Sequence, residues 1–299
     1  MKQLQVYHVD AFTNQRFGGN AAGVVPDATG LSEIEMQNIA RELNLSETAF
    51  LIPTTSEGQF RVRYFTPKSE IDFCGHATLG AAWLMATEFG WKPESTELIF
   101  ETNVGTVPIR GFIGDDGMIE RVFMRQAPPR IRHVDVPIEK IAYAIGMDVS
   151  ELDPKYPIRL GYTGNWHLFI PVRSRSSIDT AQPRLTELGQ MNTEQKAATT
   201  HLFTFAAEGS PYDIYTRDFA PAVGIAEDPV TGAANGALAG YLVLEGMLDA
   251  NAPHSLKIAQ GDTVGRPGIV YVDTFPGDLT EIHVGGTAVV TVSGQLFLD

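Results

Sequence analysis

The chain has 299 residues, 43% of them apolar, and a formal net charge of −14. This length and apolar content suffice for the core of one large domain or of two ordinary ones. The acidic balance argues against the basic surface that binding to nucleic acid or to an anionic membrane requires. The first residues alternate polar and apolar side chains, without an apolar segment of signal-peptide or membrane-spanning length, so we expect a cytoplasmic protein.

Motifs for a metal or a cofactor are missing from the sequence. Cys74 is the single cysteine, so an internal disulfide is excluded, and the common cysteine and histidine spacings of zinc sites do not occur. There is no Walker A run and no G-x-G-x-x-G after a strand, because the glycines of GGNAAG (18–23) are wrongly spaced. We therefore predict no metal and no nucleotide or nicotinamide cofactor.

Taken in chain order, most of the elements that the sequence predicts are strands. They are short, rich in β-branched and aromatic residues, and bounded by turn residues. The predicted strands cover residues 5–12, 61–65, 97–102, 106–112, 120–126, 166–172, 201–206, 212–216, 269–275 and 288–298. The segment 126–137 interrupts this pattern and is a plausible crossover between two halves of the chain.

One surface helix is predicted from Ser32 to about Leu43. Ser32 and Glu35 have the spacing of a capping box, in which each side chain binds the other residue's backbone N–H. Apolar residues follow at helical spacing, namely Met36, Ile39, Ala40 and Leu43.

The two halves of the sequence resemble each other. RYFTP (63–67) leads into CGHATLGAAWLM, and RDFAP (217–221) leads into DPVTGAANGALAGYL. Alignment of Gly75 with Gly232 places Cys74 opposite Thr231 and His76 opposite Ala233.

Each of these glycines begins a segment that is apolar on almost every face and reaches a glycine suited to a helix C-cap, Gly90 or Gly246. Such a helix must be surrounded by protein. Two curved antiparallel sheets, each wrapped around one central helix, satisfy both the helix and the strand patterns. We therefore predict an α+β protein with two like domains.

The starts of these two helices are candidate anion sites. The first turn of a helix presents unpaired N–H groups and the positive end of the helix dipole. Gly75 and Gly232 would let a ligand approach the backbone closely. If the halves face each other across a cleft, both helix starts would hold a small carboxylate in the field that proton abstraction requires.

The motifs RYFTP, CGHAT, LSETAFL and EDPVTG, in this combination, resemble the PhzF family of phenazine-biosynthesis isomerases and its YddE-like bacterial relatives, which share the fold of diaminopimelate epimerase. The resemblance covers essentially the whole chain. It implies two pseudo-symmetric domains, each an antiparallel sheet rolled into a barrel around a central helix, with an active site in the cleft and no cofactor. It also implies a homodimer, and domains of residues 1–122 with the C-terminal strand 285–299, and 123–284.

The resemblance assigns the proton transfer to a glutamate that matches Glu47 in LSETAFL. From the residues alone, Glu47 lies between the capped helix and the apolar run 48–52. Burial would disfavour its charged form and move its pKa towards the range useful for a general acid and base. The alternative is a solvated loop glutamate.

Three further positions have two interpretations each. His76 either contacts the substrate or caps its helix, and the resemblance favours contact. Asp228 either receives a substrate ammonium group or caps the turn at Pro229, and the resemblance favours the ammonium group. Asn20 either lines the cleft, like the family's early Gly-Asn motif, or forms a tight turn.

Cys74 matches one of the two thiols that flank the substrate in two-cysteine epimerases, but its counterpart here is Thr231. Two-base epimerisation of that kind is therefore not expected, and Cys74 is interpreted as a packed residue at a helix start. A cysteine hydrolase using Cys74 and His76 is a weaker reading, because residues at i and i+2 at a helix start do not face each other.

Ala233 stands where the phenazine enzyme has a serine, so the contact of that hydroxyl with substrate is lost. The leading hypothesis is a cofactor-independent isomerase that shifts a proton on a small carboxylate-bearing substrate. Glu47 would act as acid and base, His76 and Asp228 would position the substrate, and the amides near Gly75 and Gly232 would hold its carboxylate. The alternative is a non-catalytic protein that binds small acids and has kept the fold.

Overall fold

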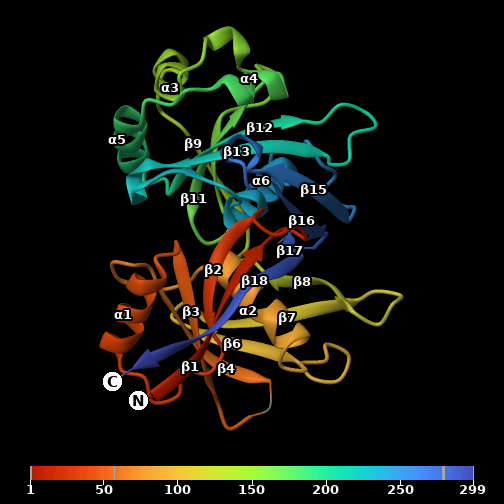
Figure 1. Ribbon diagram of the computed structural model, residues 1–299. Coiled ribbons are helices and arrows are strands. Elements are labelled where there is room, and N and C mark those ends of the chain that lie inside the picture. The colour runs from red at the N-terminus through yellow and green to blue at the C-terminus, as the bar shows by residue number, and fades with distance from the viewer. Residues whose placement is uncertain (1, 57, 278–279, 299) are drawn as a thin grey trace. The chain divides into compact units, whose positions relative to one another are not determined.

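The computed structural model describes residues 2–56, 58–277 and 280–298 and is drawn in Figure 1. The chain divides into two compact units, Met1–Arg125 with Gly285–Asp299, and Gln126–Val284. Among the helices of these described residues, none is both long and apolar enough to cross a membrane.

The first unit consists of nine strands and two helices within the described residues. Its strands are β1 (Lys2–Ala11), β2 (Asn20–Val25), β3 (Glu47–Pro53), β4 (Gln59–Phe65), β5 (Glu70–Ile71), β6 (Leu98–Thr102), β7 (Gly105–Ile113), β8 (Ile119–Arg125) and β18 (Ala288–Leu298). Its helices are α1 (Glu33–Leu43) and α2 (Gly75–Thr87).

The strands of the first unit form one sheet that bends around α2. β18 pairs with β1, and β1 with β2, both antiparallel, whereas β2 and β3 are parallel. β3 pairs with β4 antiparallel, β4 with β6 parallel, and β6, β7 and β8 continue antiparallel. Because α2 contacts β1 and β18 as well as β8, at opposite ends of this series, the sheet curves around the helix.

The second unit contains more helix. Its strands are β9 (Arg130–His133), β10 (Arg159–Tyr162), β11 (Trp166–Pro171), β12 (Thr199–Phe205), β13 (Ile214–Ala220), β14 (Ile225–Asp228), β15 (His254–Gln260), β16 (Gly268–Phe275) and β17 (Glu281–Gly286), whose last two residues are grouped with the first unit. Its helices are α3 (Ile138–Ile145), α4 (Arg175–Thr180), α5 (Leu185–Gln195) and α6 (Gly232–Leu244), with short 3-10 turns η1 (Val149–Glu151), η2 (Pro221–Val223) and η3 (Asp262–Val264).

The strand pairing of the second unit repeats that of the first. β9, β10 and β11 are antiparallel, β11 and β12 parallel, β12 and β13 antiparallel, β13 and β15 parallel, and β15 and β16 antiparallel. The central helix α6 packs on β9, β10, β11 and β16. The prediction of two like α+β units, each with a sheet around a central helix, is confirmed, and the parallel pairs are a feature that it did not include.

Both central helices begin at the predicted glycines, Gly75 and Gly232. The residues that precede them, Cys74 and Thr231, have extended backbone, and their side chains do not cap the backbone N–H groups of the helix. At the other end, Gly246 directly follows the cap residue of α6, as predicted, but α2 ends at Thr87, before Gly90. Gly90 has a positive φ of 73°, so it serves the turn that follows the helix.

The surface helix α1 confirms the capping box. Ser32 Oγ accepts a hydrogen bond from the Glu35 backbone N–H at 3.3 Å, and Glu35 Oε2 accepts one from the Ser32 N–H at 2.7 Å. Met36, Ile39 and Ala40 are buried against the outer face of the first sheet.

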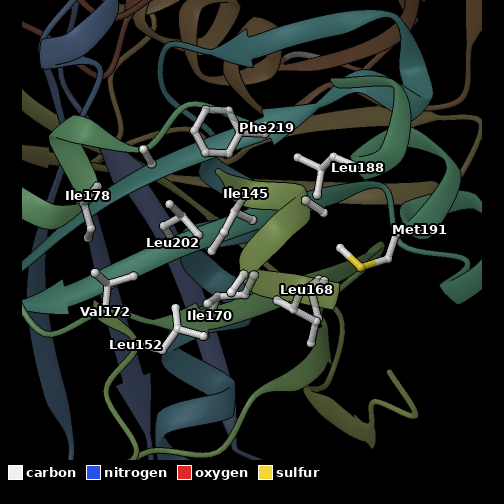
Figure 2. Packing of buried hydrophobic residues seen from close by; sticks show 14 of the residues in the cluster. Ile145, Leu152, Leu168, Ile170, Val172, Ile178, Leu188, Met191, Leu202 and Phe219 are labelled. Atoms are coloured by element: carbon white, nitrogen blue, oxygen red, sulfur yellow. The ribbon is translucent and has the colours of Figure 1, made fainter. Parts of the chain in front are cut away.

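Strand β9, within the expected crossover, and strands β10, β14, β15 and β17 were not predicted. Nor were three helices of the second unit, α3, α4 and α5. They cover a second apolar core, which Figure 2 shows, where Ile145, Ile178 and Leu188 meet side chains from β11 and β12. Short helices of this kind gain most of their stability from packing rather than from local propensity, so the sequence pattern gave little indication of them.

Candidate active site

Strand β3 and helix α2 bring Glu47 and His76 together in the first unit. Helix α1 ends at Leu43, and its cap residue Asn44 has a left-handed φ of 51° that turns the chain back; β3 starts three residues after Asn44, at Glu47. The parallel pairing places Glu47 opposite Ala22 of β2. His76 is the second residue of α2, so its side chain projects from the helix start.

The Glu47 carboxylate and the His76 imidazole are in direct contact. Glu47 Oε2 lies 3.2 Å from His76 Nε2, and their side chains are only 14% and 11% exposed. Ser46 Oγ lies 3.4 Å from the same nitrogen and donates to the Ala21 carbonyl at 3.3 Å. The solvated-loop interpretation of Glu47 does not fit this burial.

Burial lowers the pKa of His76 below its usual 6.5, and the nearby Glu47 carboxylate offsets this only in part. His76 is therefore mainly neutral at pH 7, with one ring N–H. If that proton lies on Nε2, it is donated to Glu47, and Nδ1 is left as an acceptor.

Cys74 supplies the matching donor. Its Sγ lies 3.4 Å from His76 Nδ1, so the expectation that these two residues do not face each other is wrong. The physical reason is that Cys74 precedes the helix with φ −141° and ψ 118°, so helical i, i+2 geometry does not apply. Cys74 is only 7% exposed, and a neutral imidazole does not stabilise a thiolate, which favours a packed thiol over a nucleophile.

Glu47, Cys74 and His76 each offer one potential metal ligand atom, and these atoms lie within 4.8 Å of one another. The thiol, however, is closer to Nδ1 than to Nε2, at 3.4 against 3.9 Å, whereas the carboxylate contacts Nε2. A single ion on the lone pair of either nitrogen would not face both other ligands. The arrangement suits a chain of hydrogen bonds better than a shared ion.

Gly75 leaves open space beside the first turn of α2. A Cβ atom built on it would have Met124 Cε, at 3.9 Å, as its nearest neighbour. The helix N-terminus is therefore approachable by a ligand group close to Glu47 and His76. Asn20 is 3% exposed and begins β2, two residues before Ala22, so it starts a strand rather than forming the tight turn that was the alternative.

In the second unit, Asp228 ends β14 just before α6 and is tied to the helix start. Thr231 Oγ1 donates to Asp228 Oδ2 at 2.6 Å, and Gln260 Nε2 donates to the Asp228 carbonyl at 2.9 Å. Gly232 is buried, and Ala233, which is half-buried, accepts a hydrogen bond at its carbonyl from Thr163 Oγ1 at 3.4 Å. Ala233 presents a methyl group at the position where the resemblance implies a serine hydroxyl.

Sequence reasoning missed three polar residues around these helix starts. Ser46 precedes Glu47 directly, and no spacing in the sequence distinguishes it from other serines. Thr231 was identified only as the counterpart of Cys74, not as a partner of Asp228. Gln260 comes from β15, and no local pattern connects it with a residue 32 positions away.

The comparisons with known proteins match this fold over its whole length. The family model described as phenazine biosynthesis-like protein matches residues 9–294. A solved structure from Bacillus anthracis, a phenazine biosynthesis protein of the PhzF family, has a TM-score of 0.90 at 33% identity and covers 100% of both chains. This chain therefore belongs to the phenazine biosynthesis-like family.

Two curated relatives indicate the class of enzyme. The chain is 36% identical to the uncharacterized isomerase YddE of Escherichia coli, over 99% of this chain and 99% of that protein. It is 30% identical to trans-2,3-dihydro-3-hydroxyanthranilate isomerase of Pseudomonas aeruginosa, over 97% of this chain and 98% of that protein. With this family and fold, the protein is an isomerase.

Proposed function

We propose that this isomerase shifts a proton on a small carboxylate-bearing substrate, with Glu47 as the general acid and base and without a cofactor. The observation that carries the proposal is the contact of 3.2 Å between Glu47 Oε2 and His76 Nε2, at side chains that are only 14% and 11% exposed. A carboxylate held by a neutral hydrogen-bond donor in a largely dry site is suited to accept and return a proton.

The neutral state of His76 matters for this chemistry. An imidazolium would form an ion pair with Glu47 and make its carboxylate a weaker base, whereas a neutral N–H only orients it. In the proposed step Glu47 takes a proton from one carbon of the substrate and returns it to another, so no proton is gained or lost. The amides at the start of α2, beside Gly75, would stabilise the negative charge that develops near the substrate carboxylate.

Asp228 and the start of α6 are proposed to hold the other end of the substrate, as the sequence motifs suggested. The Pseudomonas aeruginosa relative is named for a substrate that carries both an amino and a carboxyl group, which supports a role for Asp228 with an ammonium group. Gly232 and Ala233 would supply backbone amides, and Asn20 would line the site. Because Ala233 offers no hydroxyl, the preferred substrate is proposed to differ from that of the relative.

The experiment follows deuterium incorporation by mass spectrometry after incubation in D2O. The purified protein is mixed with a panel of small amino and hydroxy acids that includes trans-2,3-dihydro-3-hydroxyanthranilate. We expect exchange into at least one compound, reduced by about 100- to 10,000-fold in Glu47→Gln, because that is the usual contribution of a general acid or base.

Glu42→Gln is the matched control, since Glu42 is an exposed carboxylate five residues away and outside the proposed site. It should retain full exchange. Equal exchange by Glu47→Gln and the wild type would remove Glu47 from the mechanism. Heat stabilisation by a compound that undergoes no exchange would instead favour the non-catalytic binder of small acids.

The oligomeric state and the cellular location of the protein remain predictions. A homodimer is expected from the family resemblance, and sedimentation of the purified protein at several concentrations would distinguish a dimer from a monomer. Cytoplasmic location would be checked by fractionation of the source cells.

A further inference from the structure

A network of buried polar side chains in the second unit has no part in the proposed chemistry so far. His167 comes from β11, Thr199 and His201 from β12, Asp218 from β13 and Asn235 from α6, and each is 7% exposed or less. Groups of this kind are costly to bury unless their hydrogen bonds are made. Their hydrogen-bond directions therefore carry information on protonation.

Backbone groups fix the direction of the network at Gln260. The Thr231 N–H can only donate, and it lies 3.2 Å from Gln260 Oε1. The Asp228 carbonyl can only accept, and it lies 2.9 Å from Gln260 Nε2. The amide of Gln260 thus has one orientation.

The orientation of Gln260 in turn fixes that of Asn235. Asn235 Nδ2 donates to Gln260 Oε1 at 2.9 Å and to the Thr231 carbonyl at 3.0 Å. Rotation of this amide by 180° would place its oxygen against two other oxygens. Asn235 Oδ1 therefore faces His201 Nε2, at 3.2 Å.

His201 consequently faces an acceptor at both ring nitrogens, since its Nδ1 lies 2.8 Å from Asp218 Oδ1. A neutral imidazole has one N–H and can make only one of these two bonds as a donor. We infer that His201 is an imidazolium paired with the Asp218 carboxylate, and that it positions Asp228 through Asn235 and Gln260. Thr199 Oγ1, which donates to Asp218 Oδ1 at 2.6 Å, adds a second donor to that carboxylate.

His167 is the neutral counterpart in the same network. Because the Thr199 hydroxyl gives its proton to Asp218, its oxygen accepts from His167 Nδ1, at 2.9 Å. His167 Nε2 has no hydrogen-bond partner among the described residues. One of the two buried histidines is thus charged and the other is not, and only the charged one is joined to Asn235.

The path from His201 ends at a group that binds substrate under the proposed function, and the positioning role rests on that proposal. Gln260 Nε2 also donates to Thr231 Oγ1 at 3.0 Å, and this hydroxyl donates to Asp228 Oδ2. Loss of the His201 Nε2–H would leave Asn235 Oδ1 as a buried acceptor without a donor, although Gln260 Oε1 and the Thr231 carbonyl still fix the orientation of the Asn235 amide. The hydrogen bonds from Asn235 to Gln260 and from Gln260 to Thr231 would weaken, and the Asp228 carboxylate would be held less rigidly.

The protonation state is tested without any substrate. Nitrogen-15 NMR of the histidine side chains in the full-length protein at pH 7.5 reports which ring nitrogens carry hydrogen, and through-bond correlations assign them. We expect two protonated nitrogens for His201 and one for His167. An unprotonated nitrogen on His201 would overturn the inference. Asp218→Asn, which keeps the shape of the side chain, should convert His201 to a singly protonated ring.

The positioning role is tested by amide hydrogen exchange in His201→Phe, with His167→Phe as the matched control. We expect exchange at Thr231 and in the first turn of α6 to quicken by about tenfold or more in His201→Phe only, with β12 and β13 unchanged. A purely structural role would raise exchange throughout the unit, and equal effects in both variants would refute the positioning path. If His201→Phe does not fold, Asp218→Asn takes its place in this comparison.

A kinetic measurement connects the path to the substrate. With trans-2,3-dihydro-3-hydroxyanthranilate, or whichever compound of the panel exchanges, His201→Phe should raise KM more than it lowers kcat. An unchanged KM together with faster amide hydrogen exchange at Thr231 would show that the network does not affect substrate binding. Absence of turnover in the wild type would count against the proposed function, while the NMR result would still decide the charge of His201.

Discussion

The two units of the chain have the same strand pairing but different polar residues at the starts of their central helices. Both carry an arginine–glutamate pair in corresponding places, Arg63 with Glu70 and Arg217 with Glu227. The first pair connects β4 to β5, and the second connects β13 to β14. The repeated ion pair holds the local fold, which both units need.

The residues that differ between the two units are those that could take part in a reaction. Glu47 begins β3 opposite Ala22, and the corresponding residue of the second unit is Thr199, which begins β12 opposite His167. In the first unit a carboxylate and an imidazole face each other beside an open helix start. In the second unit the equivalent strand positions belong to a buried hydrogen-bonded network, in which only His167 Nε2 and Asp218 Oδ2 are left without a partner among the described residues. Positions at which the two units carry different residues are therefore a better guide to function than positions at which they carry the same residue.

The largest expected effect separates Glu47 from its counterpart. Glu47→Gln should lower proton exchange by about 100- to 10,000-fold with little change in unfolding free energy. Thr199→Val should lower the unfolding free energy by about 1–3 kcal/mol, because His167 and Asp218 each lose a buried partner. Deuterium exchange and urea denaturation measure the two. A large loss of stability in Glu47→Gln would contradict the division of roles.

The two arginine–glutamate pairs should differ in strength because their burial differs. Glu227→Gln leaves Arg217, only 7% exposed, without its anion and should cost about 3–5 kcal/mol of unfolding free energy. Glu70→Gln should cost about 1 kcal/mol, because Arg63 is 20% exposed and keeps Glu33 as a partner. Equal losses on urea denaturation would show that the pairs are equivalent in energy as well as in position.

Histidine burial should make stability depend on pH through the second unit. Burial lowers the pKa of His167 to about 4, against about 6.5 in the unfolded chain. Between pH 6.5 and 4 the unfolded state therefore binds more protons, and unfolding free energy falls as the pH falls. The loss attributable to His167 is about 3 kcal/mol.

The control for this pH effect is His167→Phe, because this change removes the titrating imidazole. The variant then resembles the first unit, where Ala22, which does not titrate, occupies the equivalent position. The unfolding free energy of the variant should fall less steeply than that of the wild type between pH 6.5 and 4. Urea denaturation at several pH values measures this. Parallel pH profiles for the variant and the wild type would contradict a neutral, buried His167.

The smallest effect is expected at Cys74. Cys74→Thr gives the first unit the residue of the second and should lower proton exchange by less than about tenfold, since a hydroxyl can still donate to His76 Nδ1. A nucleophilic thiol would instead make this variant inactive. Proton exchange of the variant in D2O decides between them, and a thiol reagent should label the buried wild-type cysteine only slowly.

Local signals in the sequence determined much of this fold. The capping box at Ser32 and Glu35, the glycines that begin α2 and α6, and the repeated R-x-F-x-P motif all act within a few residues, so a pattern of spacing was enough to find them. Most strands of the first unit followed from their β-branched and aromatic runs, but β2 and β5 were not predicted. Glu47 was found as a candidate because the resemblance drew attention to it, not because any spacing required it.

The tertiary structure decided what depends on residues distant in the chain. The contact between Glu47 and His76 joins a strand to a helix 29 residues later, and the network of His201 joins three strands to α6 and Gln260. Cys74 has extended backbone and precedes the helix, so helix spacing does not describe how its thiol faces His76. Local propensity acts over a few residues, whereas the hydrogen bonds that set charge and orientation are made only when distant segments pack together.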